Sequence, residues 1–250
     1  MSVLKNLNYG IIGNCRSAAL ISDKASIDWC CLPKFDSSSV FAKILDDEKG
    51  GGFWIETKQK YHISQTYLKN TCILRTIFRN ENHEFEVIDF MPRFIKNKGE
   101  FYAPPEIIRI VRPIKGSPEI KFKYDPRLEY AQGETKHVVK KNMIRSRVDS
   151  PKHDSLFLYT NIENIKIIQS NLHKLEGTIF FNISYNEKLK TPQLSDCLLN
   201  FDRTKVYWLN WCSKTPVFKH YNNQILRSAM TLKLMSYDKT GAVLAAVTTS

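Results

Sequence analysis

The 250-residue sequence has no run of apolar residues that approaches the roughly 18 needed to cross a membrane as a helix. Its first ten residues, MSVLKNLNYG, also lack the apolar stretch of a secretory signal peptide. Hydrophobic residues make up 42% of the chain, which favours a globular protein over a disordered one. We therefore expect a soluble, cytoplasmic protein with no membrane partner.

Motifs for metal and redox chemistry are also lacking. The six cysteines form no C-x-x-C pair, no histidine stands near them at zinc-ligand spacing, and the six histidines are scattered singly. Buried free thiols in a reducing compartment are the favoured interpretation, over metal or redox chemistry. We expect no metal site and no cofactor.

Nucleotide and acyl-transfer motifs do not occur either. The chain has no G-x-x-x-x-G-K-[ST] phosphate loop and no G-x-S-x-G elbow. The net charge of +12 permits binding to nucleic acid. However, the basic residues alternate with apolar ones, as in KFKYDPRL, which is typical of solvated strand faces. Nucleic-acid binding is therefore the least favoured hypothesis, and we expect no nucleic-acid partner.

Alternation of apolar and polar residues dominates the chain from residue 8 to 185. About a dozen short segments have this period of two, among them SAALIS (17–22), SIDWCC (26–31), EFEVIDFMP (84–92) and GTIFFNISY (177–185). They predict a mainly β fold built as a large antiparallel β-sandwich. One exception is VFAKILDDEKGGG (40–52), where we predict a short helical turn closed by glycines.

Helical patterns appear after residue 186. NEKLKTPQLSD (186–196) is polar and indicates a linker, followed by a helix over 202–212. We expect Asp202 to cap that helix, with an apolar stripe of Val206, Leu209, Trp211 and Cys212. A second helix is predicted in 222–241, ended by Gly241 and apolar on nearly every side, so that it must be buried on most sides.

The predicted organisation has three parts. Residues 1–185 form the sandwich, 186–221 a linker with a helix, and 222–250 the start of a further domain. The apolar end AVLAAVTTS predicts that another segment or a second chain supplies the surface that covers it.

The stretch IDWCCLPKFDSSSVF (27–41) carries aromatic residues, acids and two adjacent cysteines. It reads Asp28–Trp29, Cys31–Leu32–Pro33 and Phe35–Asp36–Ser37. Further blocks are VIDFMPR (87–93), IIRIVRPIKG (107–116), DPRLEYA (125–131) and LRSAMTLKLMSYDKTGAVLAAVTTS (226–250). In this order they resemble the N-terminal region of bacterial and archaeal family-15 glycoside hydrolases, which include glucoamylases, trehalases and glucodextranases.

The resemblance implies a supersandwich joined by a helical linker to an (α/α)6 barrel, of which this chain holds the first helix. It implies inverting hydrolysis of α-glucosidic bonds, with the catalytic glutamates beyond residue 250 and an α-glucan, maltooligosaccharide or trehalose bound through that barrel. The chain would then be inactive alone and pack against the barrel. The alternative is a stand-alone carbohydrate-binding or assembly module.

Candidate site residues follow from the same stretch and from the last helix. Trp29, Phe35, Asp36 and Arg227 are expected to bind substrate or to form a domain interface, with packing against the barrel favoured over sugar contact. No catalytic residue is expected in this chain. Asp28, Asp36 and Asp89 are expected to accept hydrogen bonds from backbone amides.

Overall fold

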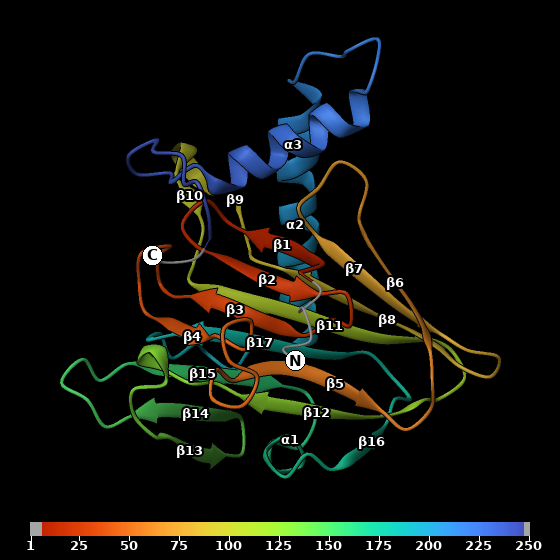
Figure 1. Cartoon of the computed structure of the whole chain (residues 1–250), viewed down its shortest axis with the longest axis vertical. Coiled ribbons are helices and arrows are strands. Elements are labelled where there is room, and N and C mark those ends of the chain that lie inside the picture. Colours follow the sequence, from red (N-terminus) through yellow and green to blue (C-terminus); the bar gives the residue numbers. More distant parts are fainter. Residues whose placement is uncertain (1–6, 248–250) are drawn as a thin grey trace, which may run out of the picture.

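The protein, described here over residues 7–247 of a computed structural model, is mainly β, as the alternation predicted. Two large antiparallel sheets face each other, and two long helices lie over one end and one outer face (Figure 1). Residues 1–6 and 248–250, the two ends of the predicted domains, lie outside the described residues.

The first sheet has the strand order β1-β2-β3-β5-β12-β16, with β4 beside β3. Its strands are β1 (Tyr9–Gly13), β2 (Ala18–Ser22), β3 (Ile27–Cys31), β4 (Ser39–Phe41), β5 (Gly52–Thr57), β12 (Glu119–Asp125) and β16 (Leu172–Lys174). No continuous helix forms in 40–52, but the predicted turn closed by glycines is present: the Gly50 N–H donates to the Asp46 carbonyl four residues earlier, as in a single helical turn. Gly51 then turns the chain into β5 with a φ of +64°. Glycine adopts this left-handed conformation without steric cost.

The second sheet has the order β13-β14-β15-β17-β11-β8-β7-β6. Its strands are β6 (His62–Tyr67), β7 (Leu74–Arg79), β8 (Glu84–Phe90), β11 (Glu106–Lys115), β13 (Thr135–Lys140), β14 (Met143–Val148), β15 (Ser155–Thr160) and β17 (Ile179–Tyr185). A small separate ribbon pairs β9 (Phe94–Ile95) with β10 (Phe101–Tyr102). Short 3-10 turns occupy Asn97–Gly99 and Glu129–Ala131.

The main core lies between the two large sheets. Phe181 of the second sheet meets Phe53 and Phe122 of the first with ring centroids 5.1 and 4.6 Å apart. A buried ion pair joins Asp89 to Arg109 at 2.7 Å. The Arg109 guanidinium also donates to the Phe53 carbonyl of β5 and to the Ala25 carbonyl in the turn between β2 and β3. The pair therefore links both sheets.

Two of the acids expected to bind backbone amides have side-chain partners. Asp89 is paired with Arg109, and Asp28 accepts hydrogen bonds from the hydroxyls of Tyr9 and Ser26. A buried carboxylate needs a cation or hydrogen-bond donors to offset the loss of water. The sequence does not show which residue the fold brings to each of them.

The helices are α1 (Asn164–Ile168), α2 (Leu194–Ser213) and α3 (Asn222–Met235). The prediction that Asp202 caps the first long helix is wrong: α2 begins eight residues earlier, and Gln193 and Asp196 form a reciprocal capping box. The predicted stripe is correct in part: Cys212 is buried and Trp211 half-buried, but Val206 and Leu209 are exposed. The buried residues of α2 are Cys197, Thr204, Trp208 and Cys212.

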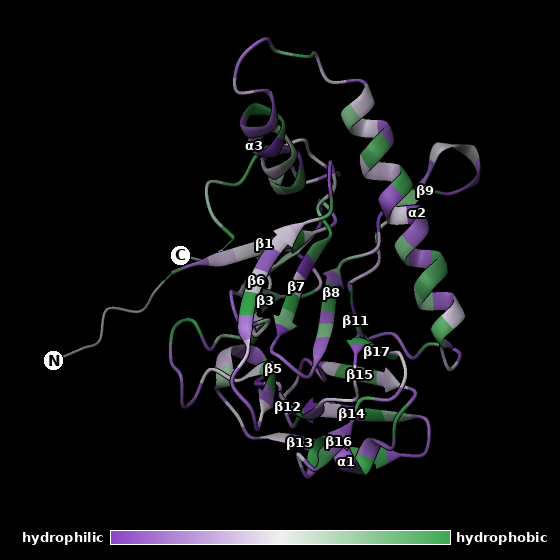
Figure 2. Ribbon diagram, turned by 90° about the vertical axis from the view of Figure 1, so that its right-hand side faces the viewer, coloured by the Kyte–Doolittle hydropathy of each residue, from purple (hydrophilic) through white to green (hydrophobic). Residues whose placement is uncertain are grey.

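The burial of α2 follows from its position. Its first half covers the outer face of the second sheet, where Cys197, Leu194 and Phe201 pack on residues of β8, β11 and β17 (Figure 2). Strand β17 is consequently buried at every position. The six cysteines are all free and buried, as predicted.

Helix α3 ends at Met235 and not at Gly241, which lies in a later turn. It buries one face, with Met230, Leu234 and Met235, and leaves Leu232 59% exposed. The expectation of burial on most sides is therefore not met within residues 7–247. Within the same range, no helix is long and apolar enough to cross a membrane.

Candidate functional site: the junction of sandwich and C-terminal helices

The junction begins with Arg93, which follows β8 in the VIDFMPR block. Its side chain is fully buried. The guanidinium lies 4.3 Å from the centroid of the Phe101 ring, and it donates to the Tyr207 hydroxyl at 2.9 Å and to the Asn14 carbonyl at 2.6 Å. Arg93 thus connects the sandwich to the second half of α2.

A carboxylate completes this network. Asp238, just after α3, accepts from Arg93 at 3.3 Å and from Arg16 at 3.0 Å, and its backbone N–H donates to the Cys15 carbonyl. Both arginines belong to sandwich loops, so they fix the chain where it leaves α3. Sequence reasoning missed Arg16, Arg93 and Asp238; the only available signal was an arginine directly after an apolar strand.

The predicted aromatic residues lie at the same junction, but neither presents an exposed ring. Trp29 is 1% exposed, and its Nε1–H donates to the Val247 carbonyl at 2.6 Å. Phe35 is 5% exposed and belongs to a buried cluster with Trp208 and Leu234. The surface expected to meet a further domain is thus covered by the C-terminal segment of this chain.

The two predicted charged residues behave differently. Arg227 of α3 is half-buried, lies 4.0 Å from the Tyr67 ring centroid, and donates to the Thr71 carbonyl at 2.8 Å and to the Cys72 thiol. Asp36 is exposed on the loop after β3. The fold therefore gathers Trp29, Phe35 and Arg227 at the junction and leaves Asp36 at the surface.

The thiols of the junction are protonated at neutral pH. Burial raises the pKa of Cys72 to about 12, although the nearby Arg227 guanidinium opposes this rise. Burial likewise raises the pKa of Cys31 to about 12, aided by the charge of Asp36. Neither group is a ready nucleophile, since the thiolate is the reactive form.

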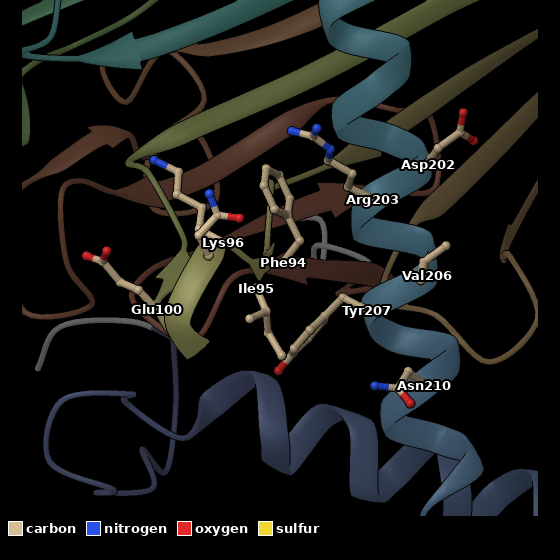
Figure 3. Close-up of a pocket in the computed structure, with 10 residues that line it drawn as sticks. Phe94, Ile95, Lys96, Glu100, Asp202, Arg203, Val206, Tyr207 and Asn210 are labelled. Atoms are coloured by element: carbon tan, nitrogen blue, oxygen red, sulfur yellow. The ribbon is translucent and has the colours of Figure 1, made fainter.

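A cavity of about 710 Å³ opens beside the arginine network, between the β9–β10 ribbon and α2 (Figure 3). Its apolar lining comes from Phe94 and Ile95 on β9 and from Val206 and Tyr207 on α2. Ile95 and Val206 are exposed, at 53% and 63%. The Tyr207 ring therefore contributes both to the buried network and to this cavity, which we call the junction groove.

Polar side chains surround the junction groove. Lys96 and Glu100 come from the ribbon, whereas Asp202, Arg203 and Asn210 come from α2. Figure 3 shows Lys96 and Arg203 on either side of Phe94, and the Arg203 guanidinium lies 5.2 Å from that ring. Two basic and two acidic side chains thus line the groove together with the apolar residues.

Comparison with known proteins defines the family of this chain. Residues 7–174 match a family model described as "Trehalase-like, N-terminal". The chain belongs to the trehalase-like N-terminal family.

Curated relatives of the trehalase-like chain include three trehalases. The trehalase of Thermoplasma volcanium is 31% identical over 97% of this chain and 39% of its own length. Those of Thermoplasma acidophilum and Mycolicibacterium smegmatis are 29% and 25% identical over 92% and 97% of this chain, and over 40% of their own length in each case. This chain therefore spans about two fifths of the length of the relatives it matches.

Proposed function

We propose that this chain is the non-catalytic N-terminal part of an inverting α-glycosidase of the trehalase type, related to family-15 glycoside hydrolases. The observation that carries the proposal is the match of residues 7–174 to the trehalase-like N-terminal family. The chain aligns to only about two fifths of each trehalase, which supports placing the catalytic residues in the remaining part of the enzyme. Trehalose is accordingly the proposed substrate of the whole enzyme.

The carboxylates of the described residues support a non-catalytic role. Inverting hydrolysis needs an acid and a base on opposite sides of the sugar, and the acid must be kept protonated, as burial can do. The buried Asp89 and Glu106 are engaged inside the sandwich with Arg109 and Asn182. Glu100 and Asp202 line the junction groove, but both are exposed to solvent.

The helices supply the surface on which the catalytic portion is proposed to dock. Leu198, Leu199 and Leu209 of α2 and Leu232 of α3 are between 39% and 59% exposed. We take α3 as the first helix of an (α/α)6 barrel, the region after residue 186 as the linker, and Trp29 and Phe35 as interface residues that hold the C-terminal segment. Location in the cytoplasm is part of the proposal, supported by six free thiols.

The first test is an activity assay on the purified 250-residue chain. Trehalose, maltose and starch are incubated with it, and released glucose is measured. We expect none. Release of glucose by the chain alone would overturn the non-catalytic role.

The second test restores a catalytic portion. The chain replaces the corresponding N-terminal part of the Thermoplasma volcanium trehalase, and proton NMR follows the anomers released from trehalose. We expect activity, with one α-glucose and one β-glucose released at first, since inversion converts one anomeric centre. A folded chimera that releases only α-glucose at first would contradict the inverting mechanism, and a folded chimera with no trehalase activity would contradict the proposed role.

A further inference from the structure

The junction groove has the chemical character of a binding site for a small neutral ligand. Its volume of about 710 Å³ falls within the roughly 300–1,000 Å³ typical of small-molecule sites. Its charges balance, with Lys96 and Arg203 against Glu100 and Asp202. A charged ligand would meet side chains of both signs, whereas a neutral polar ligand can use donors and acceptors of each.

The floor of the groove favours a ligand that has one apolar face. Ile95 and Val206 expose hydrophobic surface, and Tyr207 adds an aromatic ring. The Tyr207 hydroxyl already accepts from Arg93, which holds the ring in place without a ligand. A pyranose ring fits this combination, because its C–H face packs on apolar surface while its hydroxyls reach the polar rim.

Glu100, Asn97 and Asn210 provide the polar rim. They add carboxylate and amide oxygens and amide N–H groups from both sides of the cavity. All three are exposed, so they can bind a ligand without breaking a buried contact within the protein. Hydroxyl groups of a sugar both donate and accept, and this mixture matches them.

We propose that the junction groove binds a neutral, α-linked glucose disaccharide, outside the catalytic portion of the enzyme. The choice of glucose disaccharides rests on the proposed function, whereas the neutral pyranoside class rests on the groove alone. The groove would hold sugar beside the segment that leaves α3, because Tyr207 and Asp238 share the Arg93 guanidinium.

The experiment titrates the isotope-labelled 250-residue chain with trehalose and with maltose, up to tens of millimolar, while amide NMR shifts are followed. Sorbitol, a polyol without a ring, is the ligand control. We expect saturable shifts confined to the β9–β10 ribbon and the middle of α2, with an affinity that hardly changes with salt because the ligand is neutral.

Two variants with matched controls locate the site. Ile95→Ser removes apolar floor and Glu100→Gln removes a rim carboxylate; Ile114→Ser and Glu134→Gln make the same changes at exposed positions outside the groove. Each groove variant should weaken binding by about three- to tenfold, the value of one contact or hydrogen bond. The controls should bind as the unchanged chain does.

Three outcomes overturn the proposal: no shifts with either disaccharide, shifts centred elsewhere, or equal binding by the groove and control variants. Equal shifts with sorbitol would also overturn it, since they would show no recognition of a ring. None of these bears on the proposed function, which the chimera tests by glucose release. Conversely, an inactive chimera would not affect the proposal that the groove binds a neutral pyranoside, because that part rests on the groove alone.

Discussion

Replacing Glu106 by glutamine should stabilise this protein at alkaline pH. Glu106 begins β11, is 2% exposed, and accepts a hydrogen bond from the Asn182 Nδ2 of the adjacent strand at 3.1 Å. Burial raises its pKa from the usual 4.5 to about 7, the hydrogen bond from Asn182 opposes the rise, and the negative charge of Glu187 adds to it. The folded protein therefore holds this proton more tightly than the unfolded chain does.

The magnitude follows from that difference. Between about pH 4.5 and about pH 7 the folded state binds the proton and the unfolded state has lost it, so stability falls as the pH rises. Above about pH 7 the full loss, about 3 kcal/mol, persists. Glutamine carries no charge at any of these pH values, so the free energy of unfolding of the variant does not fall in this way as the pH rises.

The amide also suits its surroundings. The Asn182 Oδ1 atom is buried without a hydrogen-bond partner. A glutamine keeps an acceptor for Asn182 Nδ2 and brings an N–H of its own, which can satisfy that oxygen. The substitution therefore removes a buried charge and offers the unpaired Asn182 oxygen a donor.

Urea unfolding followed by circular dichroism checks the prediction at about pH 5 and about pH 8. Glu106→Gln should change the free energy of unfolding little at the lower pH and raise it by up to about 3 kcal/mol at the higher one. Glu134→Gln, at an exposed position, is the matched control and should have little effect at either pH. An equal effect of Glu106→Gln at both pH values, or destabilisation at the higher one, would refute the reasoning.

Three further predictions concern the junction. Trp29→Phe removes the donor to the Val247 carbonyl and some buried volume, so it should lower the free energy of unfolding by about 2 kcal/mol and speed hydrogen exchange near residue 247. Trp54→Phe, at a half-buried position, is the control and should have neither effect. Asp238→Asn leaves the buried Arg93 without its carboxylate and should lower the free energy of unfolding by about 3 kcal/mol, measured by urea; an unchanged midpoint would show that the pair is dispensable. The exposed apolar face of α2 and α3 should bind a hydrophobic dye or self-associate, and a dye-free monomer would contradict the proposed docking surface.

The strand pattern made most of the sandwich predictable, since a residue's face in a sheet follows from its position in the sequence. The segments around 17–31, 84–92 and 177–185 all became strands of the two sheets. Short pairings such as β9 with β10 were not predictable, because two residues carry no readable period. The start of α2 was misplaced because NEKLKTPQLSD is polar, and Gln193 is an uncommon cap.

The candidate site shows where sequence reasoning stops. The Asp28–Trp29 and Phe35–Asp36–Ser37 blocks pointed to the junction, but the burial of Trp29 and Phe35 could not be inferred without knowing that α3 and Val247 cover them. Arg93 and Asp238 stand 145 positions apart, and only folding joins them. The junction groove likewise combines a ribbon and a helix that share no local pattern.

The sequence by itself determined that the chain forms antiparallel sheets, keeps its cysteines as buried thiols and resembles the N-terminal region of glycoside hydrolases. These properties depend on periodicity, composition and the order of motifs. Only the tertiary structure decided which side of α2 is buried, that Trp29 holds the C-terminal segment, and that a charge-balanced groove opens beside Tyr207. The physical reason is that burial and pairing between distant residues depend on the neighbours that folding supplies.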